Sequence, residues 1–185
     1  MLEIRVHGRG GQGVVTASEI IAISAFKDGF FSQAFPSFGV ERTGAPIEAF
    51  TRISNKFIRT REQIYNPDII IVLDASLLDS QTVSQGIKKE TKILINTSLS
   101  LEDILKKYSN LKIKKENILI IDATNIALKI LGKNLANTVI LGALAKQTEI
   151  ISINGLKKAI SEKFSEKNKD IIKKNLKAVI SAYEK

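Results

Sequence analysis

VHGRGGQG, residues 6–13, is the stretch of this chain that decides its fold. Alternating apolar residues at Leu2, Ile4 and Val6 lead into it and predict a strand, and four glycines then fall within six residues. An apolar segment with helical spacing starts directly behind the glycines at Val14. A strand, a glycine turn and a helix form the opening unit of an α/β nucleotide-binding fold, so we predict a Rossmann-like opening unit.

The glycine turn is also the first candidate binding site. Glycines let the backbone turn tightly and bring its N–H groups close to a ligand or to another chain. The helix that begins there presents unpaired N–H groups and the positive end of its dipole, which favour an anion. We therefore predict an anion-binding or partner-binding turn formed by Gly8, Arg9, Gly10, Gly11, Gln12 and Gly13.

The glycine spacing leaves an alternative open. Gly8-x-Gly10-x-x-Gly13 matches the dinucleotide fingerprint, which needs an acidic residue near the end of the second strand to hold the ribose. Here the predicted second strand, Phe30–Phe35, runs into Pro36, and Asp28 precedes the strand. A free-standing nicotinamide- or flavin-dependent oxidoreductase thus explains the glycines but not the missing acid.

Further apolar patterns predict the rest of the sheet. Continuous apolar runs at Ile69–Leu73, Lys92–Ile95 and Ile118–Ile121 are typical of parallel strands that helices cover on both faces. Ile47–Ser54 alternates, and a short turn at Asn55-Lys56 would return Phe57–Arg59 as an antiparallel partner. We expect a three-layer α/β/α fold with a mostly parallel mixed sheet and an antiparallel hairpin, in a single domain over residues 1–185.

Apolar residues with helical spacing predict helices in the segments between these strands. Polar residues at the ends of three strands, Asp74, Asn96 and Asp122, lie either at a ligand-binding edge or at helix caps and turns. Gly132 is the expected end of one helix. The predicted helices are Leu77–Lys89, Leu101–Tyr108, Ala123–Leu131 and Thr138–Gln147, followed by two helices with apolar faces at Leu156, Ile160, Phe164 and at Ile172, Leu176, Val179, Tyr183.

Composition excludes several kinds of site. The 185 residues include no cysteine, which rules out disulfides, iron–sulfur ligation and a cysteine nucleophile in this chain. The single histidine, His7, is either a structural or a catalytic imidazole. We find no Gly-x-Ser-x-Gly elbow, no phosphate-binding loop and no metal-spaced cluster, and therefore predict no catalytic residue and no metal site.

The net charge of +9 raises the question of a nucleic-acid partner. Residues 154–185 hold nine lysines and four acidic residues but no arginine, which is unfavourable for base recognition. We interpret this segment as a solvated helix face that could steer an acidic partner, because nucleic-acid binding would explain only the charge. No apolar run reaches the roughly 18 residues that a membrane span needs, and MLEIRVHG does not match a signal peptide, so we expect a cytoplasmic protein without membrane or nucleic-acid contact.

A long loop follows the second predicted strand. It is either a rigid connector with a surface ion pair or a loop that meets another protein surface. The predicted partner-interface residues are Phe35, Pro36, Phe38, Gly39, Glu41, Arg42 and Gly44.

Five segments together resemble the gamma subunit of the pyruvate (2-oxoacid):ferredoxin oxidoreductase family. The form AFP-x-FGVER resembles the pyruvate type and the closely related 2-oxoisovalerate type, while Thr43 departs from the Arg or Gly usual in the family. The segments follow one another in the family's order: HGRGGQG at His7–Gly13, AFPSFGVERTGAP at Ala34–Pro46, AFTRI at Ala49–Ile53, IYNPDIIIVLD at Ile64–Asp74 and LANTVILGAL at Leu135–Leu144.

The resemblance implies a heterooligomeric enzyme that oxidatively decarboxylates pyruvate with coenzyme A, giving acetyl-CoA, CO2 and reduced ferredoxin. It implies thiamine diphosphate and Mg between alpha and beta subunits, 4Fe-4S clusters in a delta subunit, and no cofactor held by this chain alone. The glycine turn and the Phe35–Pro46 loop would pack against the catalytic subunits near the path of coenzyme A, with Arg9 or Arg42 contacting a phosphate. The alternative within the family is a gamma subunit for 2-oxoisovalerate or another 2-oxo acid.

Overall fold

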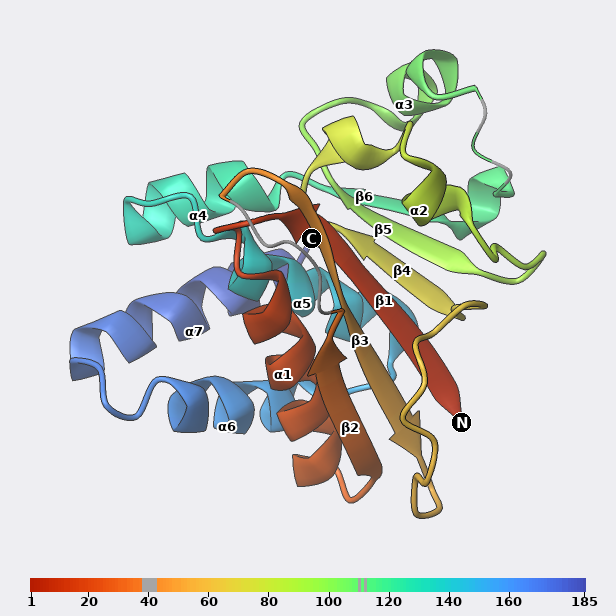
Figure 1. The fold of residues 1–185 in the computed structure, drawn as a ribbon. Coiled ribbons are helices and arrows are strands. Elements are labelled where there is room, and N and C mark those ends of the chain that lie inside the picture. The colour runs from red at the N-terminus through yellow and green to blue at the C-terminus, as the bar shows by residue number, and fades with distance from the viewer. Residues whose placement is uncertain (38–42, 110, 112) are drawn as a thin grey trace.

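One mixed sheet organises the computed structural model, which describes residues 1–37, 43–109, 111 and 113–185. Within these residues the sheet has six strands in the order β2-β3-β1-β4-β5-β6 (Figure 1). Neighbouring strands β1, β4, β5 and β6 pair in parallel, whereas β3 runs antiparallel to both β1 and β2. The strands are β1 (Leu2–Arg9), β2 (Phe31–Pro36), β3 (Pro46–Ser54), β4 (Ile69–Val72), β5 (Lys92–Asn96) and β6 (Ile118–Ile121).

Five helices cover one face of the sheet (Figure 1). Helices α1 and α5 lie against the strands, and α6 and α7 pack on α1 and α5. None of the described helices has the length and hydrophobicity that crossing a bilayer requires. The five are α1 (Val14–Lys27), α4 (Ala123–Leu131), α5 (Ala136–Thr148), α6 (Ile153–Lys163) and α7 (Lys169–Tyr183).

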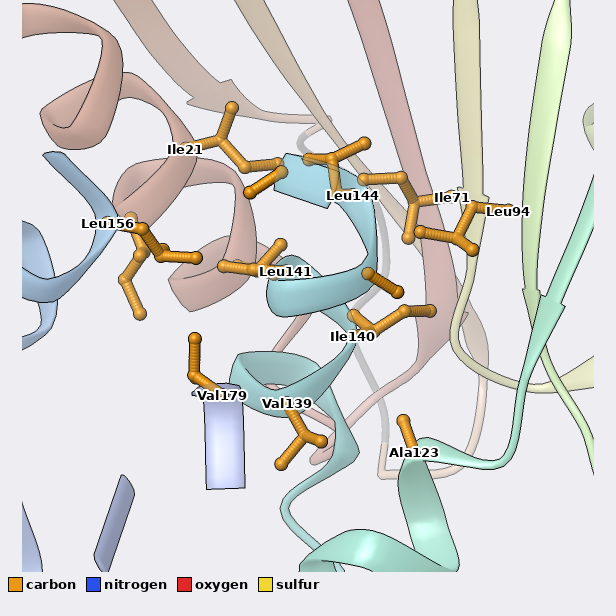
Figure 2. Close-up of a cluster of buried hydrophobic side chains, with 14 of the residues drawn as sticks. Ile21, Ile71, Leu94, Ala123, Val139, Ile140, Leu141, Leu144, Leu156 and Val179 are labelled. Carbon is orange, nitrogen blue, oxygen red and sulfur yellow. The ribbon is translucent and has the colours of Figure 1, made fainter. Parts of the chain in front are cut away.

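Helix α5 is the centre of the larger apolar core. All its residues from Ala136 to Ala145 are buried, because the sheet lies on one side of it and other helices on the other. Figure 2 shows Leu141 and Leu144 between Ile21 of α1 and the strand residues Ile71 and Leu94. A Cβ on Gly142 would lie 2.1 Å from a carbonyl oxygen of α7, so this glycine permits the close approach of the two helices.

Short helices cover the other face of β4, β5 and β6. They are two 3-10 turns, η1 (Ala75–Leu77) and η2 (Lys115–Asn117), with α2 (Gln81–Ser84) and α3 (Leu101–Lys107). Ile70, Ile93 and Ile104 belong to the second apolar cluster that they enclose. The predicted three-layer α/β/α fold with a mostly parallel mixed sheet is therefore confirmed.

The helix predicted at Leu77–Lys89 is wrong. The segment forms only η1 and α2, and it ends in an extended turn in which Gly86 has a φ of 72°. A Cβ on Gly86 would lie 1.7 Å from the carbonyl oxygen of Tyr65. The positive φ of Gly86, which lies against Tyr65 and Asn66, is incompatible with a continuous helix up to Lys89.

The antiparallel partner predicted at Phe57–Arg59 is also wrong. Strand β3 already pairs with β2 on one edge and β1 on the other, so no edge is free for a third partner. The antiparallel pairing joins β3 to strands that lie on both sides of it, and residues 55–67 run as an irregular segment instead.

Most local predictions at element ends are confirmed. Helix α4 spans Ala123–Leu131, and Gly132 ends it with a left-handed φ of 69°. Asp74 and Asp122 accept hydrogen bonds from backbone N–H groups at the starts of η1 and α4. Asn96 Oδ1 accepts a hydrogen bond from the backbone N–H of Thr124 in the first turn of α4 at 3.1 Å, so all three polar residues satisfy backbone N–H groups at helix starts.

Candidate functional site: a pocket beside the glycine turn

The glycine turn is shorter than the sequence suggested. Strand β1 continues through Gly8 to Arg9, and α1 starts at Val14. Gly8 is needed inside the strand because a Cβ there would lie 2.6 Å from a methyl group of Val14. Gly11 and Gly13 take left-handed φ values of 92° and 75°, which disfavour other residues.

Arg9 and Gln12 close one side of this turn. Arg9 Nε donates to Asp74 Oδ2 at 3.0 Å, its Nη2 donates to Ser76 Oγ at 2.8 Å, and its Nη1 donates to the carbonyl oxygen of Gly44 at 3.1 Å. Gln12 Nε2 donates to the same Asp74 oxygen at 3.2 Å. The crevice between the ends of β1 and β4, where folds of this type commonly bind ligands, is thus bridged by the chain's own side chains.

The electrostatics of Asp74 agree with this bridging role. Burial alone would raise the pKa of Asp74, but hydrogen bonds from Ser76, Gln12 and Arg9 outweigh it and lower the pKa below its ordinary value. Because Arg9 uses all three of its guanidinium nitrogens inside the chain, it holds the turn in place rather than offering a free cation.

A pocket opens on the other side of the turn. It has a volume of about 500 Å³ and lies between the start of α1, the connection of α4 to α5, and the connection of α6 to α7. Its walls are formed by Gly11, Gln12, Gly13, Thr16, Leu131, Lys133, Asn134, Leu135, Asn137, Thr138, Phe164, Lys167, Ile171, Lys174 and Asn175.

Asn137 links the pocket wall to the glycine turn. Its Nδ2 donates to the carbonyl oxygen of Gly13 at 3.2 Å, and a Cβ on Gly13 would lie 2.3 Å from the same nitrogen. Gly13 caps α1 without any side-chain hydrogen bond to the helix. The first N–H groups of a 14-residue helix therefore start at this pocket without a side-chain cap, in a position that favours an anion.

The pocket combines positive charge with apolar surface. Lys133, Lys167 and Lys174 line it, and within the described part of the chain none of the three makes an ion pair. Leu135 and Ile171 line it as well and are 42% and 45% exposed. Such a lining suits a ligand with both anionic groups and a flat or apolar part.

The predicted partner loop is placed only in part. Phe38, Gly39, Glu41 and Arg42 lie outside the described residues. Phe35 and Pro36 end β2, and Gly44, with a φ of 83°, donates its N–H to the carbonyl oxygen of Gly10 at 3.1 Å. The two stretches that the sequence singled out, the glycine turn and the end of this loop, therefore contact each other.

His7 is a structural residue. It is 2% exposed, and its Nε2 accepts a hydrogen bond from Arg5 Nε at 2.9 Å. Burial and the neighbouring Arg5 charge lower the pKa of His7 to about 3, so the imidazole is neutral at pH 7. Among the described residues no cluster of three or more His, Asp or Glu side chains is arranged to hold a metal ion.

Sequence reasoning missed Asn137 and the lysines of the pocket. Asn137 is 124 residues from Gly13, and only the fold brings them together. The one signal for Asn137 was its position in the family-like segment LANTVILGAL, directly before the helix predicted to start at Thr138.

The family model described as pyruvate ferredoxin/flavodoxin oxidoreductase matches residues 3–185. A pyruvate/ketoisovalerate oxidoreductases common subunit gamma from Pyrococcus furiosus is 51% identical over 185 residues, which cover 100% of this chain and 97% of the relative. A pyruvate synthase subunit PorC from Methanothermobacter marburgensis is also 51% identical, with the same coverage.

A solved structure shows the same fold. The crystal structure of pyruvate oxidoreductase subunit PORC from Thermotoga maritima is 37% identical in sequence and superposes with a TM-score of 0.85. The match covers 100% of this chain and 96% of that one.

Proposed function

The chain belongs to the pyruvate ferredoxin/flavodoxin oxidoreductase family, and we propose that it is the gamma subunit of a multisubunit pyruvate:ferredoxin oxidoreductase in the cytoplasm. The complex oxidatively decarboxylates pyruvate with coenzyme A to acetyl-CoA and CO2 and passes the electrons to ferredoxin. The observation that carries this proposal is 51% identity over the full length to relatives named as gamma or PorC subunits.

The active-site cofactors of the complex belong to other subunits. This chain has no cysteine for an iron–sulfur cluster, and its described residues form no metal-binding cluster. Without cysteine this chain cannot ligate an iron–sulfur cluster, so we assign the 4Fe-4S clusters to a delta subunit. On the family resemblance we assign thiamine diphosphate and Mg to the alpha and beta subunits.

A second substrate has a specific observation in its favour. The Pyrococcus furiosus relative is named as common to pyruvate and ketoisovalerate oxidoreductases. We infer that a gamma subunit of this kind serves enzymes for either 2-oxo acid, because a single gamma subunit is named as common to both in that relative.

A free-standing dinucleotide enzyme is less well supported. The β2 strand, Phe31–Pro36, contains no acidic residue for a ribose. Asp28 accepts hydrogen bonds from the N–H and hydroxyl of Ser152 at 2.6 Å each, so it is engaged elsewhere.

We assign the pocket beside the glycine turn to coenzyme A. The uncapped start of α1, with Lys133, Lys167 and Lys174, supplies positive potential for the phosphates of its nucleotide part. Leu135 and Ile171 supply apolar surface for the base. In this proposal Arg9 positions the glycine turn, and phosphate recognition falls to the turn and the lysines.

Affinity purification from native anaerobic extract tests the first proposal. The retained fraction is assayed for coenzyme A-dependent oxidation of pyruvate and of 2-oxoisovalerate, with ferredoxin as acceptor. We expect partner subunits and activity to be retained together. A chain that purifies alone and without activity would contradict the proposal.

Kinetics of the assembled complex test the pocket. The substitution Lys174→Glu should raise KM for coenzyme A about tenfold with little change in kcat, since it removes binding common to ground and transition states. Lys177→Glu, an exposed change on the same helix outside the pocket, is the matched control. An unchanged KM in Lys174→Glu would remove the pocket from the coenzyme A site.

A further inference from the structure

We propose that residues 55–67 form a docking surface for an acidic face of another subunit of the oxidoreductase. The inference rests on the proposed function, because it assumes that the chain works within a complex. It concerns the face of the sheet opposite α1, on the far side from the coenzyme A pocket.

The 55–67 segment is irregular but fixed to the sheet. It contains neither helix nor strand, and loops of this length in compact folds are usually functional. The buried Arg5 donates from Nη1 to the carbonyl oxygen of Ile64 at 3.4 Å, and Ile64 itself is 2% exposed. The segment therefore has a defined course over β1 and β3 and presents the same side chains to the outside.

Those side chains are of the kinds that dominate protein interfaces. Phe57 is 73% exposed and Tyr65 is 58% exposed. Phe57 packs edge-to-face on Phe31 of β2, with 6.1 Å between ring centroids, and Phe31 is itself 49% exposed. Exposed aromatics together with arginine are the anchors of protein–protein contacts.

A hollow of about 490 Å³ extends this surface. Gln33, Phe35, Pro36, Arg61 and Gln63 line it, so it joins the segment to the end of β2. Gln33, which lines the hollow, has a buried Oε1 without a hydrogen-bond partner among the described residues, and so does the buried Nη1 of Arg52, the residue opposite Gln33 on β3. Within the described residues, an acceptor at the hollow and a donor on the neighbouring strand are thus not used by the chain itself.

The charge of the 55–67 segment indicates which kind of partner binds to it. Lys56, Arg59 and Arg61 are exposed, and within the described residues none of them makes an ion pair. Glu62 is the acidic residue of the segment, which leaves a local charge of +2. A second copy of a chain with a net charge of +9 would be repelled, so the surface fits an acidic protein face.

Binding of the chain to the purified remaining subunits tests this surface. The double substitution Arg59→Glu/Arg61→Glu should weaken binding at least about tenfold at low salt, with a smaller effect at high salt. The control, Lys106→Glu/Lys129→Glu at exposed positions of α3 and α4, makes the same change in charge outside the lysine-rich C-terminal segment and should leave binding within about twofold of wild type. Circular dichroism verifies that all variants fold.

A photo-crosslinker at position 57 gives a second measurement in the assembled complex. It should link to an acidic segment of another subunit, whereas the same group at Leu128 of α4, which is 51% exposed, should not link to that segment. Equal binding of wild type and the arginine double variant would overturn the inference, and so would crosslinking of the chain to itself. If the wild-type complex is active in that case, the proposed function stands and only this surface is wrong.

Discussion

Strands β3 and β4 lie on either side of β1, yet they are buried by different means. All four residues of β4, Ile69–Val72, are apolar and buried between helices on both faces. In β3 the five residues from Ala49 to Ile53 are equally buried, but they include Thr51 and Arg52. The same degree of burial therefore rests on packing in one strand and on polar partners in the other.

Several buried polar groups around β3 have specific partners. Arg52 Nε pairs with Glu3 at 2.8 Å, and Ser18 of α1 donates to the carbonyl oxygen of Phe50 at 2.7 Å. A buried polar group without a partner costs about 1–3 kcal/mol. The antiparallel half of the sheet, which consists of β1, β2 and β3, therefore tolerates few substitutions that leave such a group unpaired. Arg5 of β1 and Arg52 of β3 also donate hydrogen bonds to carbonyl oxygens of the irregular 55–67 segment, which covers this face of the sheet in place of a helix.

The largest expected effect is in the parallel half of the sheet, which consists of β4, β5 and β6. Leu94 of β5 is fully buried in the core shown in Figure 2, so Leu94→Ala should lower the free energy of unfolding by about 3–5 kcal/mol. Urea denaturation measures this loss, and Leu99→Ala, at a position 36% exposed, is the control with an expected loss under about 1 kcal/mol. A loss of stability as small as that of the control would show that apolar packing does not stabilise the parallel half.

A smaller effect is expected from Arg5→Met in the antiparallel half. Arg5 Nη2 donates to the carbonyl oxygens of Val83 and Gln85 at 3.1 and 2.7 Å, besides its bonds to Ile64 and His7. Methionine retains most of the volume but none of the donors, so we expect a loss of about 2–3 kcal/mol. Proteolysis within residues 55–67 should also become faster, and unchanged protection there would mean that Arg5 does not hold the segment.

The strands and several helix ends of the parallel half are predicted well by the sequence. Its strands contain continuous apolar runs, and helix α4 ends at Gly132 as expected, because both signals are local. The position of β3 between β1 and β2 depends on pairings between distant segments, which no local pattern specifies. The predicted helix at 77–89 failed for a related reason, since the contact of Gly86 with residue 65 exists only in the folded chain.

In the candidate site, too, some features could be predicted from the sequence and others could not. Glycine spacing located the turn, and Gly11 and Gly13 have the left-handed φ values that require glycine. The sequence did not reveal that Arg9 would be engaged with Asp74, or that Asn137 would lie against Gly13. These contacts join residues more than 60 positions apart, so they follow from topology rather than from composition.

The smallest predicted effect is a dependence of stability on pH that originates in the antiparallel half. Burial and Arg5 lower the pKa of His7 from 6.5 to about 3, so between these values the unfolded chain binds a proton that the native chain does not. Stability from this residue is complete above pH 6.5 and is lost as the pH falls toward 3. We expect a loss of about 1–2 kcal/mol between about pH 7 and pH 5.

In His7→Gln this part of the slope should disappear, while the shifts of Asp74 and Glu48 act in both proteins and cancel in the difference. Parallel urea titrations of the two proteins over this range would contradict the assignment if their slopes were equal, and the buried polar face of β1 would then be insensitive to protonation.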